Sequence, residues 1–96
     1  MFGNFITYEV TINNLGHGEL DLESVIGSEY SVRINPGAAN VRLLITPSTS
    51  SVVADASDYL LADKEDHEFE LGRGLSRLSF YNGSGGQVKV SIAVLF

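Results

Sequence analysis

The last ten residues of the chain, Gln87 to Phe96, alternate between two sets of side chains. One set is apolar and consists of Val88, Val90, Ile92, Val94 and Phe96. The residues between them are Lys89, Ser91, Ala93 and Leu95. Successive side chains of a β-strand point to opposite faces, so a period of two predicts a strand with one buried face. We therefore expect this segment to be docked in a sheet and to form part of the core.

The same alternation recurs along the chain. Asn4 to Asn13 predicts a first strand, with Ile6, Tyr8, Val10 and Ile12 on one face. Further short strands are predicted around 30–34, 41–45, 67–71 and 77–81. Six or so short strands separated by Gly, Pro, Ser and Asn are typical of all-β folds. We expect a single domain over residues 1–96, built as a small antiparallel β-sandwich or a jelly-roll-like barrel.

Two turns carry strong local signals. Asn35-Pro36-Gly37 combines a fixed φ with a residue that tolerates positive φ, and it predicts a hairpin. Asn82-Gly83, flanked by alternating hydrophobic residues, predicts a second hairpin that joins the last two strands. Residues 20–26 are compatible with a strand or a short helical turn, and that choice stays open. For residues 51–70 we favour an extended arm with a turn.

Composition limits the classes of partner. Ninety-six residues without a cysteine support only a marginal core, with neither a disulfide nor a thiolate metal site to supplement it, so we expect oligomerisation. Twelve acidic residues against six basic ones give a net charge of -6, which opposes binding to nucleic acids. No apolar run approaches the roughly 20 residues that cross a bilayer, and Met1 to Asn4 lacks the features of a signal peptide. We expect no membrane partner and synthesis in the cytoplasm.

No arrangement of residues predicts catalysis, a metal or another cofactor. The acidic segment Asp63 to Asp66 lacks the glycine of a calcium loop and contains a lysine, so a solvated loop is expected. The serines lie in turn-rich stretches, only His17 and His67 are available as bases, and no Gly-x-Ser-x-Gly motif occurs. We therefore predict that the protein is not an enzyme.

Several apolar residues fall outside the predicted core faces. Either they form a second packed layer or they contact other subunits. The residues predicted for such a protein interface are Phe2, Phe5, Leu44, Tyr59, Leu60, Leu61 and Leu95.

The stretch from Tyr30 to Phe96 resembles small virion proteins of tailed bacteriophages. The similarity lies in the turn at Asn35, the segment Tyr59-Leu60-Leu61, the acidic strand from His67 to Leu71, and residues 75–83 followed by an apolar strand. The resemblance implies a capsid decoration or cement protein, with a trimer favoured, whose partner is the major capsid protein or another virion protein. Because a chain with a net charge of -6 would be repelled by packaged DNA, we expect the protein on the outer capsid surface of the virion.

Two alternatives are kept open. One is a neck, tail or fibre component of a phage particle, which also requires only a self-associating β domain. The other is a small carbohydrate-binding β-sandwich, in which Tyr8, Tyr30, Tyr59 and Tyr81 offer stacking platforms and the acidic loop holds calcium.

Overall fold

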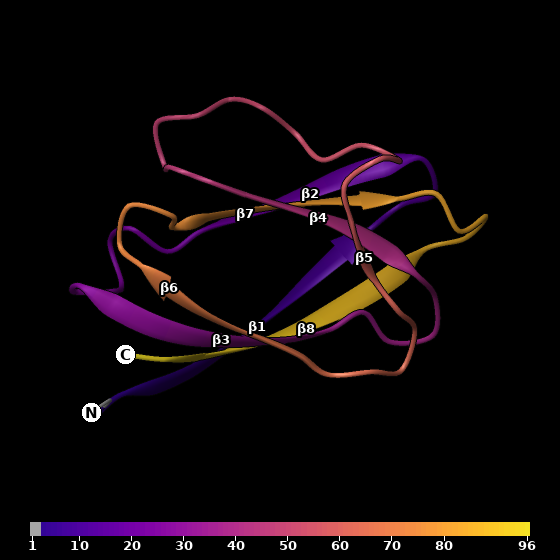
Figure 1. The fold of residues 1–96 in the computed structure, drawn as a ribbon. Helices are drawn as coiled ribbons and strands as arrows, with labels where there is room; N and C mark the ends of the chain where they lie inside the picture. Colours follow the sequence, from indigo (N-terminus) through magenta and orange to yellow (C-terminus); the bar gives the residue numbers. More distant parts are fainter. Residues whose placement is uncertain (1–2) are drawn as a thin grey trace.

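The computed structural model describes residues 3–96, which form eight β-strands (Figure 1). The strands are β1 (Phe5–Ile12), β2 (Gly16–Asp21), β3 (Glu29–Asn35), β4 (Val41–Thr46), β5 (Tyr59–Leu61), β6 (His67–Gly72), β7 (Arg77–Asn82) and β8 (Val88–Leu95).

The strands form two four-stranded antiparallel sheets that pack face to face. The order is β1-β8-β3-β6 in the first sheet and β2-β7-β4-β5 in the second. Every connection except the one from β4 to β5 carries the chain from one sheet to the other, which is the strand arrangement of a jelly roll. The predicted all-β fold is therefore confirmed, and of the two forms expected it is the antiparallel sandwich, with the strand order of a jelly roll.

Both predicted hairpins are wrong in their pairing. β7 pairs with β2 and β4, whereas β8 pairs with β1 and β3, so residues 83–87 cross between the sheets. The turn at Asn35 likewise joins strands of opposite sheets. Asn82 is buried: its Nδ2 donates to the carbonyl oxygens of Ile12 (3.0 Å) and Gly86 (2.7 Å). The Asn82 side chain thus fixes a crossover between sheets, and the positive φ of this connection falls on Gly85.

The two segments that the sequence left uncertain take defined forms. β2 ends at Asp21, and one helical turn follows, in which the backbone N–H groups of Val25 and Ile26 donate to the Leu22 carbonyl. This turn buries Leu22 and Ile26 against the core. Within residues 51–70, the predicted arm contains the short strand β5, a turn, and then β6.

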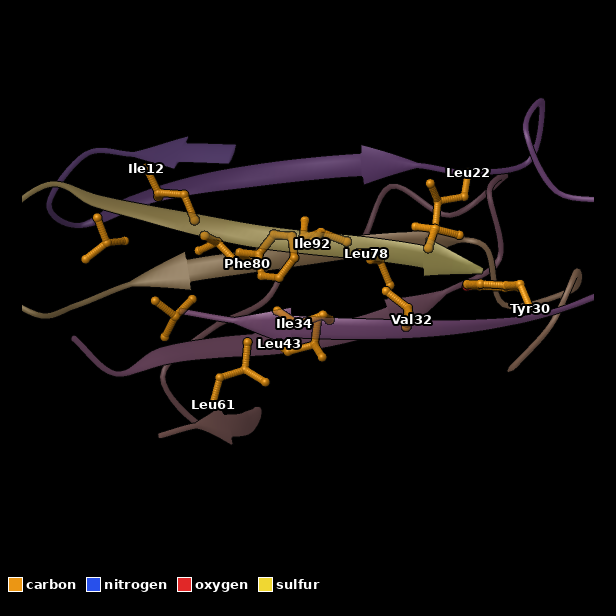
Figure 2. Packing of buried hydrophobic residues seen from close by; sticks show 14 of the residues in the cluster. Ile12, Leu22, Tyr30, Val32, Ile34, Leu43, Leu61, Leu78, Phe80 and Ile92 are labelled. Carbon is orange, nitrogen blue, oxygen red and sulfur yellow. The ribbon is translucent and has the colours of Figure 1, made fainter. Parts of the chain in front are cut away.

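The core lies between the two sheets (Figure 2). The strand predicted first from the sequence, β8, buries Val88, Val90, Ile92 and Val94. Leu78 and Phe80 of β7 are fully buried in the same cluster. Because β8 lies between β1 and β3, and β7 between β2 and β4, the centres of both sheets contribute to one core.

A long connection, residues 47–58, covers part of the outer face of the second sheet, and we call it the strap (Figure 1). Arg77 fastens it, because its guanidinium donates to the Val52 carbonyl and also pairs with Glu19 at 2.6 Å. The N–H of Ala54 donates to Ser79 Oγ at 2.9 Å. Ala54, Arg77 and Ser79 are therefore buried although they lie outside the central core.

Gly18 tests how closely the edge strands β1 and β2 approach. A Cβ added at Gly18 would lie 2.7 Å from Val10 Cγ1 and 2.9 Å from Ile12 Cγ1, which is closer than side-chain atoms pack. Gly18→Ala should therefore lower the free energy of unfolding by about 1–3 kcal/mol in urea denaturation. Gly72→Ala, where an added Cβ meets no atom within 4 Å, should change it by less than about 0.5 kcal/mol. Equal stability of the two variants would contradict the packing described.

Tyr30 should make the fold sensitive to alkali. Burial, with a smaller contribution from Asp21, raises the pKa of Tyr30 from 10.0 to about 12. The contribution of un-ionised Tyr30 to the stability of the folded state is fully present below the pKa that Tyr30 has in the unfolded chain. It is lost as the pH rises towards the pKa of Tyr30 in the folded state, because Tyr30 ionises first in the unfolded chain. Between about pH 8 and pH 11 this residue should remove on the order of 1 kcal/mol of unfolding free energy. In urea denaturation over the same pH range, the unfolding free energy of Tyr30→Phe should decline correspondingly less than that of the unchanged protein. Equal declines in the two proteins would contradict the raised pKa of Tyr30.

Candidate assembly surface

Each sheet ends in two outer strands. Among residues 3–96, β1 and β6 flank the first sheet and β2 and β5 flank the second, and each pairs with a strand on one side only. An edge strand leaves part of its backbone N–H and C=O groups without a partner and can add a strand from another chain. These edges are the structural features best suited to self-association.

The β1 edge carries an apolar patch. Phe5 lies directly opposite Leu95 in the β1–β8 register, and the two side chains are 65% and 41% exposed. Ile6, 36% exposed at the same end of β1, lies opposite buried Val94 and faces the other side of the sheet. We call Phe5 and Leu95 the Phe5 patch. It borders a free sheet edge near both ends of the described chain (Figure 1), so a partner could cover apolar surface and pair with the strand together.

The outer face of the first sheet is otherwise small or polar. Across it, Arg33 of β3 donates Nε to Glu68 Oε1 of β6 at 2.7 Å. This hydrogen bond and the charge of Glu68 raise the pKa of Arg33 above its usual value. Both side chains are more than half exposed, so the ion pair contributes little to folding. The charges instead mark the β6 edge as more hydrophilic than the β1 edge.

Aromatic rings close the sandwich at the β5–β6 side. The ring of Tyr59 meets Phe69 edge to face at a centroid distance of 5.6 Å, and His67 at 6.1 Å. Tyr59 is still 55% exposed. The side of the sandwich formed by the edge strands β5 and β6 therefore also offers apolar surface, but this surface differs in shape and composition from the Phe5 patch.

The predicted interface residues separate into several groups. Phe5 and Leu95 are brought together, whereas Tyr59 and Leu60 lie on β5, away from them. Leu44 is half-buried on the face of β4 that also carries Arg42, opposite Ser79. Leu61 is fully buried, because it faces inward opposite Val41, and its assignment to the interface is corrected. Phe2 lies outside the described residues.

The sequence analysis missed other exposed apolar side chains. They are Ile6, Leu15, Val52, Val53 and Leu75. Val52 and Val53 are exposed because the strap is held through backbone groups and Ala54. Leu15 is 67% exposed and has a φ of 58°. The sequence Asn-Leu-Gly around it is typical of a turn and could have indicated that this side chain is exposed.

Residues 3–96 show no group of three or more His, Cys, Asp or Glu side chains arranged to hold a metal ion. Asp55 has a lowered pKa, chiefly because the hydroxyl and backbone N–H of Ser57 donate to its carboxylate. These contacts stabilise a turn in the strap. In the part of the chain that the structure describes, no helix is long and apolar enough to span a membrane.

Adjacent leucines of β5 test the division between core and surface. Leu61→Ala should cost about 2–5 kcal/mol of unfolding free energy, because it removes fully buried methyl groups. Leu60→Ala, at a side chain that is 39% exposed, should cost less than about 0.5 kcal/mol. Guanidinium denaturation of the two variants measures this difference. A larger loss of stability in Leu60→Ala would mean that Leu60, and not Leu61, faces the core.

No protein-family profile and no curated protein matches the sequence. Among solved structures, the fold is similar to a chain from Bacillus endospore appendages, which form a family of disulfide-linked pili. The TM-score is 0.53 at 9% sequence identity, and the alignment covers 100% of this chain and 92% of that chain. The likeness thus extends over the full length and establishes a shared fold.

This comparison overturns the predicted phage identity. The matching structure belongs to an endospore appendage and not to a virion, so the predictions of a capsid decoration protein, a capsid partner and an outer-capsid location are wrong. The turns and alternating strands that suggested a phage protein are general properties of small jelly rolls, which serve many unrelated functions. The comparison shows a fold similar to that of the endospore appendage chain.

Proposed function

We propose that this chain is a structural building block of a self-assembling surface fibre, such as an appendage of the endospore type. The observation that carries the proposal is the full-length fold similarity to a chain of the endospore pili. The free edges of both sheets and the exposed Phe5 patch provide surface for contacts between copies. Of the earlier alternatives, a fibre component is nearest to this function.

The fibre would be held together without covalent links between these residues. The matching appendages are disulfide-linked pili, but the 96 residues of this chain include no cysteine. Cohesion would therefore come from strand pairing and from burial of apolar surface such as Phe5 and Leu95. Such a fibre should resist reducing agents and dissociate in denaturant.

We propose an open polymer in place of the closed trimer expected from the sequence. Two identical edges that pair about a two-fold axis form a dimer and stop. An edge that pairs with a different edge of the next copy leaves a free site at each end, and growth continues when the rotation between copies does not close a ring. The apolar end of β1 and the charged β6 edge differ in this way, and we propose that unlike edges meet.

Net charge should control the onset of assembly. Each copy carries a formal charge of -6, and copies that approach one another repel. Salt screens this repulsion, with a Debye length of about 10 Å at 0.1 M. Polymerisation should therefore begin at a lower protein concentration as the salt concentration rises.

The direct test is assembly of the purified chain, followed by light scattering and negative-stain electron microscopy with and without dithiothreitol. Fibres should form in both conditions. Phe5→Lys should raise the critical concentration by about tenfold or more, because it places a charge on a patch that assembly buries. Ser51→Lys, at an exposed position of the strap, serves as the matched control for charge and should leave the critical concentration within about twofold.

Circular dichroism should show both lysine variants folded, since neither position is buried. Two results would contradict the proposal. One is a chain that stays monomeric at high protein and salt concentrations. The other is fibre formation that Phe5→Lys and Ser51→Lys impair equally.

A further inference from the structure

A row of four side chains crosses the outer face of the second sheet at the end of the strap, where the Asp58 carbonyl accepts a hydrogen bond from Arg42. Strand registers place His17 of β2 beside Tyr81 of β7, Tyr81 beside Arg42 of β4, and Arg42 beside Leu60 of β5. The rings of His17 and Tyr81 are in contact, with centroids 5.2 Å apart. The row therefore combines aromatic, cationic and apolar groups on one rigid sheet.

Loops surround the centre of this row and form a depression there. The depression of roughly 510 Å³ has Arg42, Leu60 and Tyr81 in its floor. Its rim includes Asn40, Asp63 and Ser84. A volume of this order is typical of sites for small molecules. Gly83 keeps the edge of the Tyr81 ring clear, because a Cβ there would lie 3.2 Å from Tyr81 Cε2.

The polar groups of the depression have unused hydrogen-bonding capacity. Within residues 3–96, Arg42 forms no ion pair, and the hydrogen bond from its Nη1 to the Asp58 carbonyl (3.2 Å) is the only one that its guanidinium makes. By contrast, the other strand arginines, Arg33 and Arg77, are each paired with a glutamate. Asn40 Oδ1 accepts from the Asp63 N–H at 2.8 Å, which orients the rim but leaves the Asn40 amide N–H₂ and the Asp63 carboxylate free of other protein partners in the described chain.

We propose that this depression binds a saccharide. Sugar hydroxyl groups both donate and accept hydrogen bonds, so one ring could accept from Arg42 and Asn40 while donating to Asp63. The apolar C–H face of a sugar ring matches the ring of Tyr81 and the side chain of Leu60. The site needs no calcium. Of the four tyrosines named from the sequence it uses Tyr81, since Tyr8 lies on β1 of the other sheet, Tyr30 is fully buried, and Tyr59 packs on His67 and Phe69.

The charge balance favours a saccharide over a simple anion. An isolated carboxylate or phosphate would pair with Arg42 but would face Asp63 on the rim of the same depression. A hydroxyl-rich ligand makes favourable contacts with both residues. Neutral and uronic-acid-bearing sugars share this chemistry, and separate arms of the experiment distinguish them.

The experiment uses the full chain, held below the concentration at which it associates, on a glycan array with neutral and uronic-acid-bearing glycans in the presence of EDTA. Glycans that bind on the array are then titrated into ¹⁵N-labelled protein and followed by NMR spectroscopy. The changes in amide chemical shift should concentrate at residues 40–42, 63 and 81. Arg42→Gln and Asp63→Asn should each weaken binding by about tenfold or more. Arg73→Gln, which changes an exposed arginine outside the depression, should leave binding unchanged.

Asp63 is exposed and contacts Asn40 through its backbone only, so Asp63→Asn retains the fold. Absence of binding to every glycan would overturn the proposal, as would binding that Arg42→Gln and Asp63→Asn leave intact. Shifts at the same residues on raising protein concentration alone would assign the depression to a second copy and also overturn it. The first two outcomes do not depend on whether the chain forms fibres.

Discussion

The contact between the buried faces of β7 and β8 is the interaction on which the rest of the structure depends. These strands occupy inner positions of opposite sheets, and their residues, among them Phe80 and Ile92, belong to one buried cluster. β1 and β3 pair with β8, while β2 and β4 pair with β7. Because six of the eight strands are thus organised by one pair, loss of this contact would release both sheets.

The same arrangement creates the surfaces available for function. A jelly roll places its apolar centre between two short sheets and leaves four strands as edges. The strap covers part of one outer face through buried Arg77 and Ser79, and beside it Arg42 and Tyr81 lie in a depression that Ala56 of the strap helps to line. One fold therefore supplies edges suited to assembly and, on a separate face, a depression suited to a small ligand.

The sequence predicted the elements better than their connections. The period of two in residues 87–96 and 4–13 reported which side chains face the core, and β8 and β1 follow it. That period does not report which sheet a strand joins, so Asn82-Gly83 was interpreted as a hairpin. A crossover and a hairpin need similar turn residues, and the buried hydrogen bonds of Asn82 that distinguish them depend on Ile12, 70 residues away.

The candidate surface could be predicted only in part. Phe5 and Leu95 were recognised as surplus apolar residues, but their pairing depends on the long-range register of β1 with β8. Leu61 was misplaced because a three-residue strand is too short for alternation to define its faces. The depression around Arg42 combines residues from β4, β5, β7 and four loops, and no local pattern indicates that these converge.

Cryo-electron microscopy of the assembled chain is the measurement that tests the central claim most directly. The account predicts a polymer in which an edge strand of one jelly roll continues a sheet of the next, with Phe5 and Leu95 buried at the junction and no covalent link between copies. Polymers joined through the loops or the strap, with every sheet edge still open to solvent, would contradict it.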